Sequence, residues 1–118
     1  MPGAALFIGW GPVVPGREQK SLQVFNEGVA YWQRLQQQGE IDSFEVVTLE
    51  PHGGDLGGFA LLHGDREKLE RVRYSEEFLR LNARAGLVVE NLGVVAGFAG
   101  DELNRLFADF QAQAADLA

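Results

Sequence analysis

A glycine-rich stretch between two apolar runs constrains the fold of this chain most. Residues 52–64 read HGGDLGGFALLHG, and the preceding run at 41–51, IDSFEVVTLEP, is rich in β-branched and apolar residues. Glycine supplies the backbone conformations that tight connections between strands require. The stretch is therefore predicted to be the connection of an antiparallel hairpin, with FALLHG as its second strand.

Other uses of the glycine stretch do not fit its context. A phosphate-binding loop needs a lysine and a following helix, and a dinucleotide fingerprint must also open a helix, whereas GGDLGG leads into a strand. Asp55 is the only carboxylate in the stretch, which is too few ligands for calcium. His52 and His63 have no third ligand fixed by spacing, so no metal site is predicted.

The N-terminal part predicts a strand followed by a long amphipathic helix. Residues 4–10, AALFIGW, form an apolar run that ends at a Gly-Pro pair, as is typical of a buried strand. From about Arg17 apolar residues recur at three- and four-residue steps, and Gly39 is expected just beyond the helix end. The predicted buried stripe is Leu22, Phe25, Val29 and Trp32, widened by Val24, Tyr31 and Leu35.

Capping residues divide the second half of the chain. Asp65 is expected to cap a short helix, REKLERV, and Ser75 a second helical segment in which Phe78 turns inward. Residues 87–98, LVVENLGVVAGF, predict a long strand with a candidate bulge at Gly93. Asp101 is expected to cap a last helix, with an apolar face made of Leu103, Leu106, Phe107 and Phe110.

The order of these elements predicts an α+β fold over residues 1–118 as a single domain. Strand, helix, two strands, helix, strand and a C-terminal helix is the ferredoxin-like βαββαβ plan, with an antiparallel four-stranded sheet. Helices then cover one face of the sheet and leave the other bare, and the long strand is polar on neither face. A second copy is the expected cover, so a homodimer is predicted.

Composition excludes several classes of function. The net charge of -7 argues against a nucleic-acid partner, because phosphate binding needs clustered basic residues. With no cysteine, thiolate catalysis and thiolate metal sites are excluded, and no cofactor is expected. Neither a membrane-spanning run nor a signal peptide is recognised, which predicts a cytoplasmic protein without a membrane partner.

The element order, the two-part second helix around YSEEFLRL and the run AGLVVENLGVVAGF resemble the dimeric α/β-barrel superfamily. The likeness is greatest to small bacterial members without an assigned activity. It implies that two sheets face each other around a cavity. Other members include cofactor-free monooxygenases, haem-degrading oxygenases and muconolactone isomerases, so the resemblance does not fix a reaction. The first strand has no asparagine and the second helix no histidine, which departs from the oxygenase pattern.

Glu45 and His63 are the candidate catalytic residues. If Leu49 pairs with Phe59, Glu45 lies opposite His63, which would place a general base beside its orienting group. A two-residue slip would pair His63 with Val47 or Ser43 instead. A structural ion pair in the dimer interface is the favoured interpretation of the two charges.

Trp10, Glu90 and Asn91 are the candidate ligand-binding residues. Trp10 ends the first strand, where it could stack on a planar ligand, although core packing is the commoner fate of such aromatics. Glu90 is expected on the same face as Glu45, and Asn91 is a strand amide able to polarise a carbonyl. The favoured hypothesis is a protein that binds a small molecule between sheet and helices or at the dimer interface. The alternative is a cofactor-free isomerase, lyase or monooxygenase-like enzyme.

Overall fold

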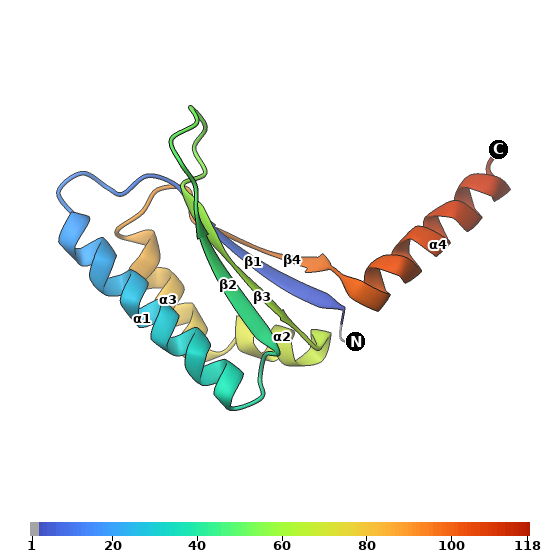
Figure 1. The fold of residues 1–118 in the computed structure, drawn as a ribbon, viewed down its shortest axis with the longest axis horizontal. Helices are drawn as coiled ribbons and strands as arrows, with labels where there is room; N and C mark the ends of the chain where they lie inside the picture. The colour runs from blue at the N-terminus through green and yellow to red at the C-terminus, as the bar shows by residue number, and fades with distance from the viewer. Residues whose placement is uncertain (1–2) are drawn as a thin grey trace.

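The computed structural model describes residues 3–118, in which one four-stranded antiparallel sheet carries helices on one face (Figure 1). The strand order is β2-β3-β1-β4, so the predicted ferredoxin-like α+β arrangement is confirmed. The elements in chain order are β1 (Ala4–Trp10), α1 (Glu18–Gln37), β2 (Ser43–Thr48), β3 (Gly58–Gly64), α2 (Arg66–Arg73), α3 (Glu76–Gly86), β4 (Gly93–Phe98) and α4 (Gly100–Asp116).

Local capping signals set most of the helix ends as predicted. Gly39 follows α1 with φ +74°, a conformation that glycine adopts without steric cost. The Asp65 carboxylate accepts the Lys68 N–H at the start of α2, and the Ser75 hydroxyl accepts the Phe78 N–H at the start of α3.

The start of α4 differs from the prediction. Residue 99, an alanine in extended backbone, precedes the helix, which begins at Gly100 with φ +52°. Asp101 therefore lies within the first turn and is not the N-cap. Its carboxylate still lies at the positive end of the helix dipole, where negative charge is favourable.

The core lies between the sheet and the helices α1, α2 and α3. Along α1 the buried face is rotated from the predicted stripe, because Leu22 is 59% exposed and Phe25 37% exposed. Trp32 of that stripe is buried as predicted, together with Val24, Tyr31 and Leu35, which were expected only to widen it. The core side chains include Leu6, Ile8, Ala60 and Leu62 of the sheet, Tyr31, Trp32 and Leu35 of α1, and Phe78 of α3.

The last strand is shorter than residues 87–98, the range that the sequence predicted. It begins at Gly93, which pairs with Gly9 in regular register and forms no bulge. Before it, Asn91 adopts φ +56°, a left-handed conformation that asparagine tolerates better than most residues. This turn interrupts the strand, so Asn91 is not the strand amide that was predicted.

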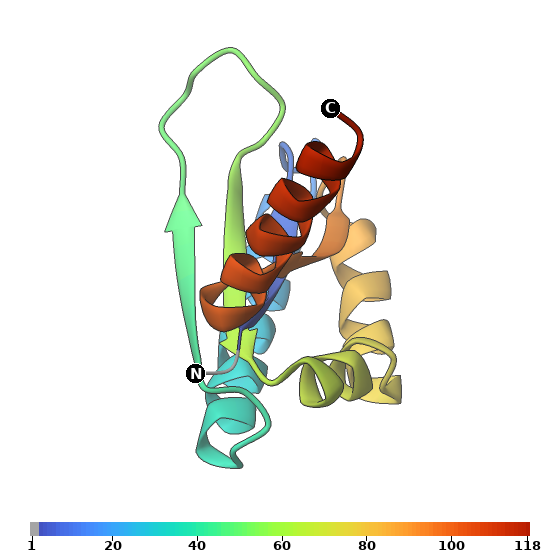
Figure 2. The same cartoon turned by 90° about the vertical axis from the view of Figure 1, so that its right-hand side faces the viewer.

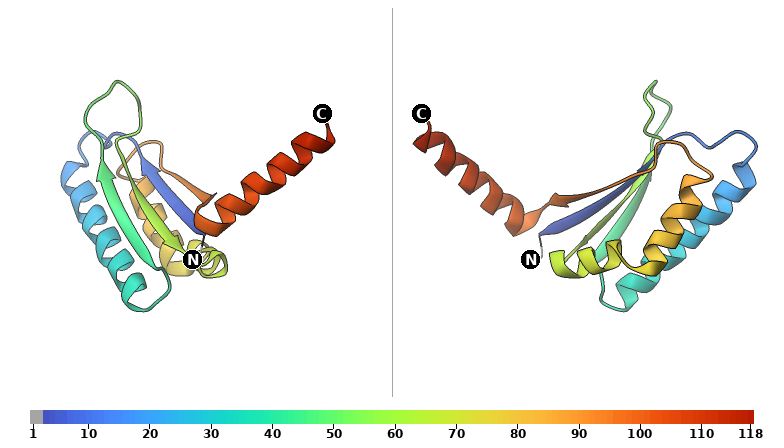
Figure 3. Two further views of the ribbon diagram at one scale, coloured as in Figure 1. Left: turned by 45° about the vertical axis from the view of Figure 1, so that its right-hand side comes forward. Right: turned by 180° about the vertical axis from the view of Figure 1, so that it is seen from behind.

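No helix covers the second face of the sheet within the described residues (Figure 3). Helix α4 extends away from the body on that side and contacts the rest of the chain mainly at β4 (Figure 2). No residue of α4 is buried. This uncovered face of the sheet, here called the open face, consists of Ala5, Phe7, Gly9, Ser43, Glu45, Val47, Phe59, Leu61, His63, Gly93, Val95 and Gly97.

Candidate functional site

A cavity of about 280 Å³ lies between the sheet and the helices α1 and α3. This volume is near the lower end of the range for small-molecule pockets. Its lining is almost entirely apolar, and the polar side chains are Ser21, Asn82 and the two indoles. The apolar walls include Ile8, Val24, Phe25, Leu81, Val88 and Leu92.

The α1 wall of the cavity is built from Gly28 and Trp32, one turn apart. A Cβ atom added at Gly28 would lie 3.4 Å from Cη2 and 3.5 Å from Cζ2 of the Trp32 ring. Glycine in a helix interior costs about 1 kcal/mol relative to alanine. Gly28 therefore lowers the stability of α1 at the position where this helix and the Trp32 ring line the cavity.

Trp32 brings an unpaired donor to this wall. Its side chain is 5% exposed, and its buried Nε1–H has no hydrogen-bond partner among residues 3–118. The indole nitrogen is a donor only, and a buried donor without an acceptor costs about 1–3 kcal/mol. An oxygen acceptor that reached this nitrogen would relieve that cost.

Trp10 and Phe25 form the aromatic part of the lining. Their rings pack edge to face with centroids 6.1 Å apart, and both rings are partly exposed. Gly58, the β3 partner of Trp10, leaves space for the indole because a Cβ there would lie within 3.0 Å of it. Trp10 is thus one predicted ligand-binding residue that lines the cavity.

Ion pairs join the two helices that wall the cavity. Arg84 of α3 donates to both carboxylate oxygens of Glu27 on α1, at 2.8 and 2.9 Å. Hydrogen bonding from Arg84 lowers the pKa of Glu27 below its ordinary value. Arg34 and Glu77 form a second pair between the same helices.

Tyr31 lies in the core beside α3. Its hydroxyl is 3.5 Å from Ser75 Oγ, and burial raises the pKa of Tyr31 above its ordinary value. Together with the buried Phe78, it fixes the spacing of α1 and α3 behind the cavity.

The hairpin register separates the predicted catalytic pair by two residues. Glu45 lies opposite Leu61, and His63 lies opposite Ser43, so the predicted direct pairing of Glu45 with His63 is wrong. The two side chains share the open face as diagonal neighbours. The connection at residues 49–57 shifts the register, since the Leu49 N–H bonds to the Gly57 carbonyl.

Glu45 and His63 also lie on the opposite side of the sheet from the cavity. Successive residues of a strand point to opposite faces, and Ile8 lines the cavity whereas Phe7 pairs with Leu61 on the open face. The structure therefore brings neither charge to the cavity.

The remaining candidates lie in loops. Glu90 and Asn91 are exposed in the turn before β4, next to the cavity residues Val89 and Leu92 but outside the lining. His52 is exposed in the hairpin connection, where its Nδ1 accepts the Gly54 N–H. Within residues 3–118, no three His, Asp or Glu side chains cluster so as to hold a metal ion.

Sequence reasoning missed Gly28, Ser21 and Asn82 as cavity residues. Only Gly28 gave a usable signal, because a glycine inside a long helix has an energetic cost that a packing role can explain. Ser21 and Asn82 are ordinary polar helix residues, and they meet only when α1 and α3 pack together.

Comparison with solved structures agrees with the topology. A dimeric protein of unknown function and ferredoxin-like fold from Bacteroides fragilis has a TM-score of 0.58 at 12% identity, covering 80% of this chain and 95% of that one. A dimeric ferredoxin-like protein of unknown function from Jannaschia has a TM-score of 0.61 at 10% identity, covering 83% of this chain and 98% of that one. The chain has the ferredoxin-like fold.

A third similar structure is SnoaB, a cofactor-independent oxygenase from Streptomyces nogalater. Its TM-score is 0.54 at 15% identity, covering 84% of this chain and 95% of that one. No family model and no curated protein matches the sequence. Because unrelated functions share this fold, the likeness carries no activity with it. In residues 3–118, no helix has the length and apolar character needed to cross a membrane.

Proposed function

We propose that this chain binds a small, mainly apolar molecule carrying a hydrogen-bond acceptor in the cavity between sheet and helices. The observations that carry the proposal are the mainly apolar cavity and the buried, unpaired Nε1–H of Trp32, one of the residues that line it. A bicyclic ketone has the required character, since its rings fit an apolar lining and its carbonyl oxygen can accept one bond. Gly28 and Trp10 are proposed to provide the space and the aromatic contact.

The proposal predicts a difference between two matched probes. Isothermal titration should show 1-tetralone binding more tightly than tetralin, which lacks the carbonyl, by about threefold to tenfold for one net hydrogen bond. Trp32→Phe removes the N–H and should abolish this preference. Gly28→Leu should block both probes, because its side chain occupies the cavity.

Glu45→Gln is the control, as this side chain lies on the other face of the sheet. It should leave both titrations unchanged, with folding of each variant checked by circular dichroism. Equal affinities for the two probes in the wild-type protein, or an unchanged preference in Trp32→Phe, would contradict the proposed role of the indole.

The second candidate function is a cofactor-free enzyme that uses Glu45 and His63 for proton transfer. It is favoured by the position of the two side chains as neighbours on the same face of the sheet. Because their side chains point away from the cavity, a substrate would have to bind at the open face. A catalysed reaction lost in Glu45→Gln, with the protein still folded, would support this alternative over binding alone.

We further propose that the chain is a homodimer joined through the open face. Phe7 and Phe59 stack on this face with ring centroids 5.2 Å apart, and Val95 is 57% exposed there. An apolar sheet face of this kind requires a cover. The two dimeric ferredoxin-like structures described above also support the proposal. Sedimentation velocity at micromolar concentration should give the mass of two chains, and Val95→Glu should shift the protein to monomer.

A further inference from the structure

Helix α4 has an apolar side that the described residues do not cover. Phe107 is 57% exposed, Phe110 69% and Leu106 41%, and every residue from 104 to 118 is exposed. The opposite side of the helix carries the charges, Arg105, Asp109 and Asp116 among them. This amphipathic pattern is that of a helix with one buried face, so a partner surface is missing.

The N-terminal end of α4 is anchored to the domain by hydrogen bonds and an ion pair. Arg66 of α2 donates to Glu102 from Nε at 2.8 Å and to the Gly97 carbonyl at 3.1 Å, and its guanidinium lies over the Phe98 ring. The Ala99 N–H also bonds to the carbonyl of residue 3. The direction of the helix is therefore defined at its start, although every residue beyond the first turn is exposed.

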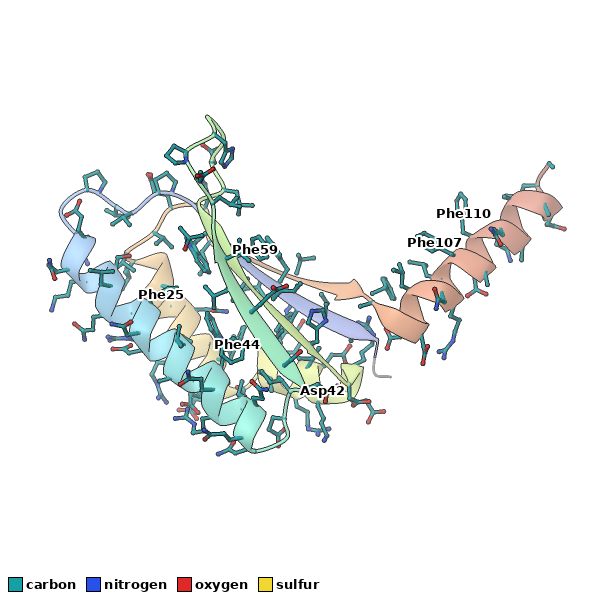
Figure 4. The ribbon with its side chains drawn as sticks, viewed as in Figure 1. Phe25, Asp42, Phe44, Phe59, Phe107 and Phe110 are labelled. Carbon is teal, nitrogen blue, oxygen red and sulfur yellow. The ribbon has the colours of Figure 1, made fainter. Side chains whose placement is uncertain are left out.

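Phe107 and Phe110 lie on the side of α4 that looks toward the open face, so the two apolar surfaces border one space (Figure 4). The helix and the sheet diverge around that space as two arms of a V (Figures 1 and 3). A second copy placed on the open face would enter the V and meet the apolar side of α4. Two-fold symmetry would make the contact reciprocal.

We propose that α4 is an exchanged arm, which packs its Phe107–Phe110 side against a second copy of this chain. The inference rests on the proposed dimer and identifies a second part of its interface. Each chain's α4 would pack against the other chain and so stabilise the contact between the two open faces.

Interface area supports a second copy as the occupant. Four strands of about six residues have a flat footprint of roughly 400 Å² on strand spacings, and a stable interface buries about 800 Å² of accessible surface per partner. The exposed parts of Phe107 and Phe110 amount to roughly 250 Å², and the partner's arm would cover a similar area on this chain. The arms would therefore add substantially to the accessible surface that the two open faces bury.

The charge of the arm argues against an anionic lipid surface as the occupant. Helix α4 carries Asp101, Glu102, Asp109 and Asp116 against the single basic residue Arg105. Helices that lie on membranes are usually rich in lysine and arginine on their polar side. A second copy has no such requirement, because its open face offers mainly apolar side chains.

The test is the dimer dissociation constant of the full chain and of the double variant Phe107→Ser/Phe110→Ser, measured by sedimentation equilibrium. The constant should rise by about a hundredfold or more, because two arms each lose a central aromatic contact. Asp109→Asn, on the charged side of the helix, is the matched control and should leave the constant unchanged. Tetralone binding should also persist in the double variant, since the cavity is made within one chain.

Three other results would contradict the proposed dimer, the proposed arm or both. A double variant that dimerises as tightly as the wild type would refute the arm while leaving the dimer intact. A wild-type protein that is monomeric at micromolar concentration would refute the dimer and the arm together. A monomer that co-sediments with phosphatidylcholine vesicles would assign the apolar side of α4 to lipid instead.

Discussion

Gly28→Ala is expected to stabilise the protein by about 1 kcal/mol. Alanine removes the helix-propensity cost of glycine, which is about 1 kcal/mol in a helix interior, and reduces the entropy of the unfolded chain. The new methyl group meets the Trp32 ring at 3.4 Å, an ordinary van der Waals distance, so no strain offsets the gain. The residue lies in the middle of α1, far from the frayed ends.

The measurement is the midpoint of thermal unfolding by calorimetry, at one protein concentration because a dimer melts in a concentration-dependent way. For a chain of this size the midpoint should rise by about 4 °C. Gly86→Ala, at the end of α3 with nothing within 4 Å of the added Cβ, is the control that changes a glycine without entering the cavity.

Binding must change in the opposite direction if the reasoning is right. The methyl group at residue 28 occupies cavity space, so tetralone affinity should fall in Gly28→Ala and stay unchanged in Gly86→Ala. A more stable protein with weaker binding would explain why glycine is present at this position. A destabilised Gly28→Ala would refute the argument, because it would mean that the Trp32 ring and the helix leave no room for the methyl group.

Two further predictions concern the core. Phe78→Ala should lower the free energy of unfolding, measured in urea, by about 3–5 kcal/mol, because Phe78 is 1% exposed and its removal leaves a cavity. A loss below about 1 kcal/mol would mean that this part of the core is not tightly packed. Burial raises the pKa of Tyr31, so the folded protein holds this proton more tightly than the unfolded chain. The resulting stability is present below about pH 10 and is lost as the pH rises from there through the folded pKa, which unfolding at graded alkaline pH should show; Tyr31→Phe should remove that part of the pH dependence.

Local signals in the sequence determined where most elements begin and end. The limits of β1, the glycine after α1, and the caps Asp65 and Ser75 were predicted and are confirmed. Each of these features depends on contacts within a few residues of chain, such as a side chain that satisfies a free N–H of the first helical turn. The element order then allowed few arrangements beyond the ferredoxin-like sheet.

The candidate site was predicted less well, because it depends on pairing between distant segments. The sequence indicated a hairpin, but the hydrogen bond from Leu49 to Gly57 decides the register and so separates Glu45 from His63. A shift by two residues keeps every side chain on its face, so the alternating pattern could not distinguish the two registers.

Which face of a helix is buried also depends on the tertiary structure. Leu22 fits the apolar period of α1 as well as Val24 does, but the sheet and α3 meet the side on which Val24 and Gly28 are buried. The cavity exists because Gly28 and Trp32 of α1 face α3 across a space that side chains do not fill.

By itself, the sequence determined the elements and their order, since these follow from backbone propensity, caps and periodicity. It also showed that α4 has an apolar side, through the spacing of Leu103, Leu106, Phe107 and Phe110. Only the tertiary structure decided that this side stays uncovered and looks toward the open face, because the direction of a helix depends on its anchors, here Arg66 and Glu102, and not on its own period.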